Sequence, residues 1–257
     1  MAGTFSFRHE KLDVYRRAVE FVSRADDILS GFSASVAVSD HLDRAAESVV
    51  THIISGNALR GGPARQHQFE IACGSALECA ACLDVCRIKR LVRPDQCHED
   101  KLLLRRIVQM LVGLIRSGAG DVHEEHGRPE EACHEHLSSP LFDHERLEVY
   151  GLALKFVSWA DALIHTGGIG GRRSKRLDVL STSVVLNTAE GNGRFLPADH
   201  RQFIDVAYQS ALKAAVLLDV MSVKAEAQTA CIEGGRGLLV SIVKLLLGMR
   251  GYLEGEV

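Results

Sequence analysis

Apolar residues recur at spacings of three and four along most of the chain, which is the period of amphipathic helices. One such stripe, within residues 9–29, consists of Leu12, Tyr15, Val19, Val22 and Leu29. Further stripes predict helices over residues 40–55, over a segment that starts near Pro63 and ends at Pro94, and over residues 100–116. Four amphipathic helices joined by short loops pack as an antiparallel up-down bundle.

The same pattern is then repeated. Residues 7–26 read FRHEKLDVYRRAVEFVSRAD and residues 142–161 read FDHERLEVYGLALKFVSWAD, with about half of the positions identical. The offset of 135 residues continues without a gap almost to the end of the chain. We therefore predict an all-α protein of two tandem antiparallel up-down four-helix bundles, residues 1–117 and 141–257, joined by an acidic His/Glu-rich linker over 118–140. Each half is expected to bury its own apolar seam, and one core shared by both halves would contradict this interpretation.

Polar residues and glycines predict where the helices begin and end. Ser39 and Ser174 stand where the second helix of each half would start, so we expect them to be N-caps. Gly56 and Gly191 are expected to end the same helices as C′ glycines. Pro94 is expected to end the third helix of the first half.

An aspartate interrupts the apolar stripe of the first helix in both halves, at Asp26 and Asp161. A carboxylate on a buried seam needs a hydrogen bond, because burying an unpaired charge is costly. Near the helix end, beside Gly31, the same side chain would be solvated. The sequence leaves both interpretations open.

Cysteine and histidine clusters raise the question of a metal site. Cys79, Cys82 and Cys86 lie on one helical face near Cys73, but their counterparts in the second half are Ala214, Leu217 and Met221. We therefore predict that these thiols pack in the core. A second group, in the linker, is expected to be solvated because a flexible acidic stretch does not orient ligands; it contains His123, His126, Cys133, His134 and His136. We expect neither a metal nor another cofactor.

Three short motifs carry a resemblance to a known family. They are LEVY at 147–150, SVVLNTAEG at 183–191 and ACGSALE at 72–78. With them, the chain resembles the four-helix-bundle family of 23S rRNA intervening-sequence proteins, related to the accessory variability determinant of diversity-generating retroelements. The family motif falls on Tyr15, Gly74, Ser75, Glu78, Tyr150, Ser183, Asn187, Glu190 and Gly191.

The resemblance implies oligomeric rings, commonly pentamers, without catalytic activity. For the retroelement branch it also implies binding of RNA and of a reverse transcriptase through basic surfaces. The chain departs from that branch in charge, because its formal net charge is −3. A five-membered ring also cannot be built from whole two-bundle chains that use both bundles.

Basic residues gather in two places and are candidates for contact with nucleic acid or with an acidic protein partner. In the first half they are Arg87, Lys89, Arg90, Arg93, Arg105 and Arg106. In the second half they are Arg172, Arg173, Lys175, Arg176, Arg194 and Arg201.

Other polar residues of the motif give no catalytic pattern. Asn187 and Glu190 are three apart on a helix and are expected to make a contact between helices or subunits. His9 and His144 recur at the start of the first helix, where a histidine is expected to meet backbone or water. The sequence contains no P-loop, dinucleotide fingerprint or triad signature. We therefore predict no catalytic residues.

These observations predict a non-enzymatic scaffold or adaptor that self-associates and binds a macromolecular partner, RNA or a reverse transcriptase. The alternative is a purely protein-binding bundle without nucleic-acid contact. The start MAGTFSFRHEK lacks an apolar signal region, and no apolar run approaches the ~20 residues of a membrane span. Seven cysteines suit a reducing compartment. We expect a cytoplasmic protein with neither membrane contact nor a small-molecule substrate.

Overall fold

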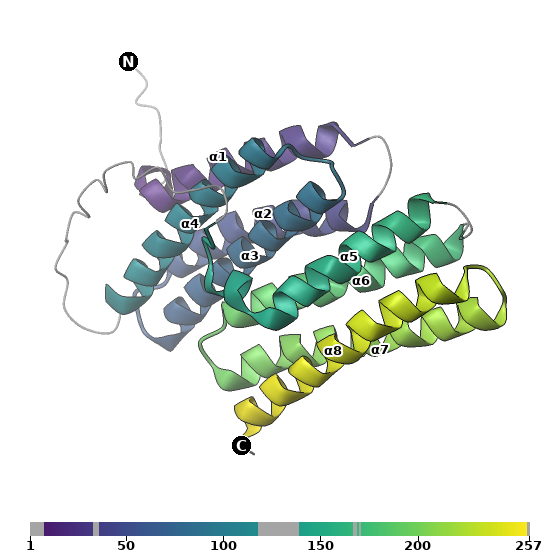
Figure 1. Cartoon of the computed structure of the whole chain (residues 1–257). Coiled ribbons are helices and arrows are strands. Elements are labelled where there is room, and N and C mark those ends of the chain that lie inside the picture. The colour runs from purple at the N-terminus through teal and green to yellow at the C-terminus, as the bar shows by residue number, and fades with distance from the viewer. Residues whose placement is uncertain (1–7, 33–35, 118–138, 167–168, 170, 256–257) are drawn as a thin grey trace.

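Helices make up the regular structure of the chain throughout the described residues, with no strand among them (Figure 1). The computed structural model describes residues 8–32, 36–117, 139–166, 169 and 171–255. Short 3₁₀ turns, η1 (Arg8–Lys11) and η2 (Asp143–Arg146), precede the first helix of each half. The α-helices are α1 (Asp13–Ser30), α2 (Ala37–Ala58), α3 (Pro63–Ile88), α4 (Pro94–Ser117), α5 (Glu148–His165), α6 (Arg172–Asn192), α7 (Pro197–Val223) and α8 (Thr229–Glu254). The predicted all-α class is confirmed.

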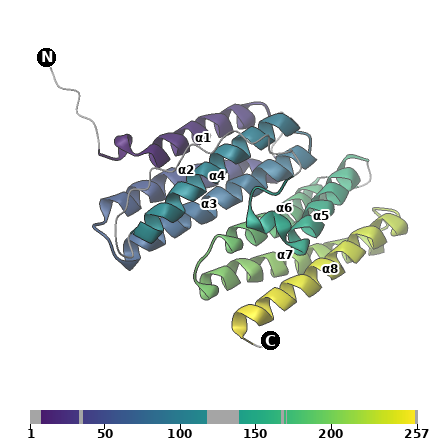
Figure 2. The same cartoon turned by 60° about the vertical axis from the view of Figure 1, so that its left-hand side comes forward.

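The helices pack in two groups of four that lie side by side (Figures 1 and 2). In the first group α1 packs on α2 and α4, and α3 packs on the same two helices. In the second group α5 and α7 each pack on α6 and α8. Successive helices run in opposite directions, as short connections require.

The expectation of two separate cores is wrong. The buried apolar side chains form one continuous cluster that runs through both groups. The reason is α3, which is buried nearly all round between residues 72 and 86. A helix with one apolar stripe can serve a single bundle, whereas a helix that is buried on every side also packs against a second group. Because the halves are not independent, the sequence-based argument for a scaffold role no longer holds, and such a role needs other evidence.

Two predicted caps are wrong because the helices start earlier than their serines. α2 begins at Ala37 and α6 at Arg172, and neither has a side-chain cap from its own preceding residue. Ser39 lies inside α2, while Ser174 lies inside α6 and donates to the carbonyl oxygen of Ile169. Pro94 also differs from the prediction, because it begins α4 and does not end α3.

Gly56 and Gly191 lie within their helices, so their predicted role as C′ residues is wrong. A Cβ atom at Gly56 would lie 2.6 Å from the ring of Phe69. At Gly191 it would lie 3.0 Å from the Cβ of Phe203. Both glycines are needed for close approach of the third helix of each group, since any larger side chain would meet an aromatic residue.

The paired aspartates of the first helices are solvated and do not form buried hydrogen bonds. Asp26 is exposed. Asp161 is partly exposed and lies 3.5 Å from His165 on the next helical turn. Of the two interpretations left open by the sequence, the structure supports the solvated one.

Among the described helices, α7 is long and apolar enough to cross a membrane by length and composition. The expectation that no apolar segment is long enough to span a membrane therefore does not hold for α7. In the structure this helix packs on α6 and α8, and residues including Ala207, Ala211 and Leu218 are buried. Its remaining surface bears on the function.

Candidate functional site

The two groups of helices meet mainly where α3 packs on α6, with further contacts from α2 to α6 and from α3 to α5. We call this contact the joint. A Cβ at Gly193, just after α6, would lie 2.8 Å from Leu77 of α3, so the two backbones approach closely there. Ala81 and Val85 lie one and two helical turns after Leu77 on the same face of α3 and are fully buried. The joint thus has a continuous apolar strip.

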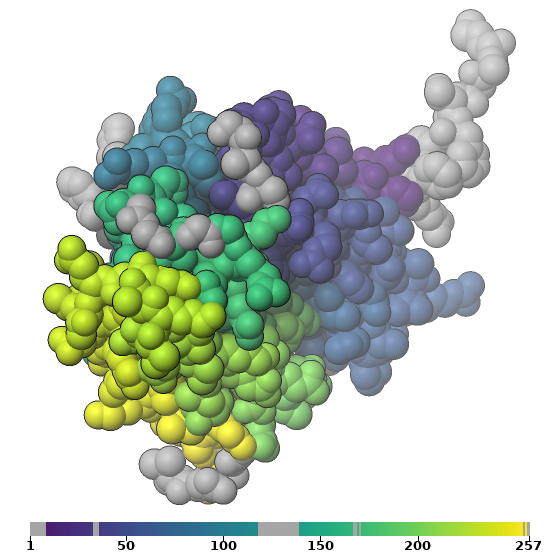
Figure 3. All heavy atoms as spheres, turned by 90° about the vertical axis from the view of Figure 1, so that its right-hand side faces the viewer, coloured from purple at the N-terminus to yellow at the C-terminus, as the bar shows by residue number. Residues whose placement is uncertain are grey.

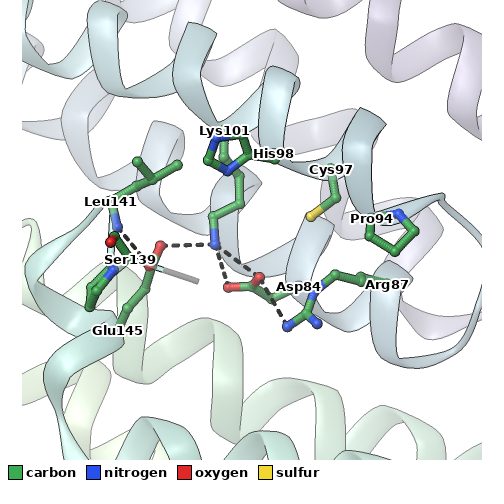
Figure 4. A pocket seen from close by; sticks show the side chains of 10 residues that line it. Asp84, Arg87, Pro94, Cys97, His98, Lys101, Ser139, Leu141 and Glu145 are labelled. Atoms are coloured by element: carbon green, nitrogen blue, oxygen red, sulfur yellow. Dashed lines mark hydrogen bonds and ion pairs between the residues drawn. The ribbon is translucent and has the colours of Figure 1, made fainter. Parts of the chain in front are cut away.

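A buried charged cluster ties α3 and α4 to the start of the second group (Figure 4). The Nζ of Lys101 lies 2.9 Å from both carboxylate oxygens of Asp84 and 2.8 Å from the carboxylate of Glu145. The hydroxyl of Tyr150 donates to the same Asp84 carboxylate at 2.9 Å. Asp84, Lys101 and Tyr150 are all buried. One ammonium group therefore bridges carboxylates from the two halves of the chain, beside a cavity of about 270 Å³.

Burial and charge perturb the ionisation of this cluster. Desolvation alone would lower the pKa of Lys101, but the carboxylates of Asp84 and Glu145 outweigh it and the pKa is raised. Burial, followed by the Asp84 charge, raises the pKa of Tyr150 well above its ordinary value. Burial and the nearby Lys101 lower the pKa of His144 to about 3. Lys101 therefore stays charged, while Tyr150 and His144 stay neutral, at physiological pH.

His144 does not occupy the position expected for a histidine at the start of a helix. Its ring is completely buried and both ring nitrogens lack hydrogen-bond partners. It stacks on Phe142 at 5.6 Å and meets Tyr150 edge-on at 4.7 Å. The prediction of a contact with backbone or water is therefore wrong for His144, because the η2 turn packs on α5 and α6 and is tied to α4 by the Glu145–Lys101 ion pair. The residue packs as an aromatic ring.

A second polar contact of the joint involves Lys89, just after α3, and Asp178 of α6. Their side chains form an ion pair and are both largely buried. The other oxygen of Asp178 accepts a hydrogen bond of 2.9 Å from the backbone N–H of Ala37. Asp178 thereby supplies the N-terminal cap that α2 lacks locally, and a carboxylate there also interacts favourably with the helix dipole.

A third polar contact contains two residues of the family motif, Glu78 and Glu190. The Glu78 carboxylate accepts a hydrogen bond of 2.9 Å from Nδ1 of His41, and Glu190 pairs with Arg194 at 2.5 Å. Burial and the charge of Glu78 raise the pKa of Glu190 to about 7, although Arg194 acts in the opposite sense. The Arg194 guanidinium lies 3.0 Å from where a Cβ of Gly74 would be, which explains the glycine of the motif.

The serines of the motif hold the second and third helices together inside each group. Ser48 and Ser75 hydroxyls are 2.8 Å apart in the first group. Ser183 and Ser210, each 135 residues later, are 2.9 Å apart in the second. Asn187 donates to the backbone carbonyl and the hydroxyl of Ser183, so its hydrogen bonds within the chain are local.

The cysteines of α3 pack in the core, as predicted. Cys79, Cys82 and Cys86 are fully buried. Burial raises the pKa of Cys86 to about 12 and that of the other two well above the ordinary value. Thiols held in their neutral form are poor metal ligands. The described residues contain no cluster suited to a metal ion, and the predicted linker group, residues 123–136, lies outside them.

The structure disperses the basic residues proposed for partner binding. Lys89 and Arg194 are largely buried in the joint, so they are structural. Arg173 pairs with Glu226 at 2.5 Å. Arg87 lies 3.9 Å from the buried Asp84. Arg93 and Arg201 have acidic neighbours nearer the surface, with 3.4 Å from Arg93 to Asp95 and 3.7 Å from Arg201 to Asp205. The members that are exposed or partly exposed on the surface also include Arg90, Arg105, Arg106, Arg172, Lys175 and Arg176.

An exposed apolar strip lies on α7. Figure 3 shows the molecule end-on, with the end of the second group where α7 leads into α8 in front. Leu212, Val216 and Val220 are 40%, 62% and 38% exposed, and Val223 follows at the helix end. They are three or four residues apart and so share one face. Contiguous exposed apolar side chains of this kind make this face a candidate for an interaction site.

Sequence reasoning missed most of the joint. Asp84, Lys101, Glu145 and Asp178 were not singled out, and Tyr150 was noted only as a motif residue. A usable signal was present in the repeat, because Asp84, Glu145 and Asp178 recur as acidic residues at an offset of 135. Charged residues retained in both copies on otherwise apolar helices indicate paired positions.

The fold and the joint define the class, an all-α protein of packed helical hairpins whose buried polar residues serve to hold helices together. Residues 10–113 match the family model described as 23S rRNA-intervening sequence protein, so this part of the chain is similar to that family. The matched segment ends within α4, and residues 141–257 lie outside it. The family is a helical one that is not known to contain enzymes. No curated protein and no solved structure matches the chain.

Proposed function

We propose that this protein is a non-catalytic scaffold that self-associates through the exposed face of α7 and presents a composite helical surface to a macromolecular partner. The observation that carries the proposal is the apolar strip of Leu212, Val216, Val220 and Val223 on that helix. The polar residues gathered at the joint support the non-catalytic part, because Lys101, Asp84 and Tyr150 bind one another and are buried.

Solution mass measured by light scattering tests the self-association. The wild-type chain is expected to have a mass above 28.0 kDa at micromolar concentration, and Val216→Glu is expected to reduce it to that of one chain. Val179→Glu is the matched control, since Val179 is 47% exposed on α6 outside the strip. A wild-type chain that stays monomeric would refute the proposal. The proposal would also be refuted if the wild-type chain floated with neutral lipid vesicles and Val216→Glu did not, because a membrane would then cover the apolar strip of α7.

Binding of RNA is a second candidate, favoured by the exposed cations Arg172, Lys175 and Arg176 at the start of α6. If these residues neutralise phosphates, the logarithm of affinity for structured RNA should fall by about 0.9 per phosphate contact for each tenfold rise in salt. Replacing all three with Gln should flatten that slope. A salt-independent or absent interaction would leave a protein partner, of which a reverse transcriptase is the one implied by the family resemblance.

A further inference from the structure

We infer that chains associate head to tail, by repeating between chains the same joint that holds the two halves together within one chain. This inference rests on the proposed self-association and adds the two surfaces that meet. The receiving surface would be that of α7 and α8, and the inserting surface that of η1, α1 and α2. Both surfaces are counterparts, at the offset of 135 residues, of surfaces that are already buried against each other.

The receiving surface repeats the charges of the joint. Asp84 and Lys101 correspond to Asp219 and Arg236, which form an ion pair of 2.5 Å while remaining about half exposed. Lys89 corresponds to Lys224, which is exposed. The second group therefore carries the acid-base pair and the lysine of the joint, without the half-chain that covers them in the first group.

The backbone around the two lysines is also the same. Lys89 and Lys224 both follow the last residue of their helices with nearly equal angles, φ −78° and −88°. The next residues, Arg90 and Ala225, both adopt the left-handed conformation, with φ of 58° and 52°. Such a conformation is uncommon for residues other than glycine. Its occurrence at both sites places the two lysines equivalently at the ends of their helices.

The apolar strip follows the same correspondence. Leu77, Ala81 and Val85 are 7%, 0% and 0% exposed within the joint. Their counterparts are the strongly exposed Leu212, Val216 and Val220. The two strips are alike in position and chemistry and differ in whether a neighbour covers them.

The inserting surface is present on the first group. Tyr150, His144 and Glu145 correspond to Tyr15, His9 and Glu10, all identical in type. His9 meets Tyr15 edge-on at 4.8 Å, as His144 meets Tyr150 at 4.7 Å. Tyr15 is only partly buried and Glu10 is exposed, whereas their counterparts lie in the joint. In the next chain, Tyr15 would donate to Asp219 and Glu10 would pair with Arg236.

Asp43 completes the set, because it corresponds to Asp178 and is exposed on α2. It would pair with Lys224 of the preceding chain and accept a hydrogen bond from the N–H of Arg172, the counterpart of Ala37. The surrounding charges fit, since acidic Asp43 and Glu47 would face the cations at the start of α6. Unlike the internal joint, where Glu78 lies near Glu190, the joint between chains would place Lys213 near Ser55.

The joint is heterologous, which means that different surfaces of the two halves meet. A two-fold relation between the halves would pack α7 on α2 as extensively as α3 packs on α6, and the described helices show no α7–α2 packing of that extent. A heterologous contact leaves one receiving and one inserting surface free on every assembly that does not close. Repetition therefore gives either a ring or an open fibre. Any such ring would contain an even number of bundles.

Two variants that each lose one surface provide the test. Val216→Glu blocks the receiving surface, and the double variant Asp43→Lys/Glu47→Lys blocks the inserting surface with exposed positions that leave the core unchanged. Circular dichroism establishes that both remain helical. Each alone is expected to be a single chain by light scattering, at concentrations where wild type is larger. Mixed in equal amounts, they are expected to form a complex of two chains and nothing larger, because only one competent pair of surfaces remains.

The outcomes separate this inference from the proposal beneath it. A mixture that remains monomeric while wild type associates would overturn the head-to-tail contact and leave self-association standing. A mixture larger than two chains would also overturn it, because the blocked surfaces would then not be those in use. A monomeric wild type would overturn both. A reversed pair, Lys224→Glu with Asp43→Lys in one chain, is expected to recover association lost in either single variant.

Discussion

Replacing Lys101 with Met is expected to destabilise the protein by about 3–5 kcal/mol, the usual effect of removing one partner from a buried ion pair. The Nζ of Lys101 contacts three carboxylate oxygens within 2.9 Å, and the side chain is 9% exposed. Without the ammonium, the carboxylates of Asp84 and Glu145 would be left facing each other in a desolvated site. The hydroxyl of Tyr150 would still donate to Asp84, which places the expected loss toward the lower end of the range.

Urea unfolding followed by circular dichroism measures this change. With a slope of about 1–3 kcal/mol per molar urea, the midpoint should fall by at least about 1 M. Arg236→Met is the matched control, because Arg236 pairs with Asp219 at the equivalent position but is 54% exposed. Exposed pairs contribute about 0–1 kcal/mol, so the control should shift little when single chains are compared. Equal shifts for the two variants would refute the argument that the Lys101 cluster holds the halves together.

Three further changes have expected results. Gly56→Ala should destabilise the protein by about 1–3 kcal/mol, because the new Cβ would lie 2.6 Å from Phe69. Gly113→Ala, at an exposed position of α4 with no atom near the new Cβ, should stabilise it by up to about 1 kcal/mol. Thermal unfolding of the two variants measures the difference. The pKa of Glu190 is raised from 4.5 to about 7, so ionisation of this carboxyl destabilises the fold as pH rises between those values. The free energy of unfolding of Glu190→Gln should therefore rise by up to about 3 kcal/mol relative to wild type between pH 5 and pH 8. A difference in urea midpoint that does not change with pH would contradict this. A thiol reagent should modify exposed Cys231 in the native protein far faster than the fully buried Cys79, and comparable labelling rates by mass spectrometry would show that α3 opens readily.

The helices could be predicted because they depend on local periodicity. The third helices begin at Pro63 and Pro197, where a missing N–H costs nothing, and the cysteines of α3 follow the spacing of a core stripe. The caps could not be predicted in the same way. Ser39 resembles a cap locally, yet the actual cap of α2 is Asp178, 141 residues from Ala37 in the sequence.

The joint escaped prediction for a related reason. Periodicity shows that a helix has an apolar face, but α3 has apolar residues around its whole circumference between residues 72 and 86. The sequence interpretation assigned all of them to one bundle. The face of α3 that meets the second group is marked by the contacts of Asp84 with Lys101 and Tyr150. Those contacts join residues far apart in the sequence, so local periodicity does not reveal them.

The cap supplied by Asp178 also bears on whether either half could be removed. α2 begins without a capping side chain of its own, and Lys101 needs a carboxylate from residue 145. Each half thus depends on atoms of the other. Deleting either half would leave the start of α2 without its cap or a buried charge without its partner, so the loss of one half would destabilise the other.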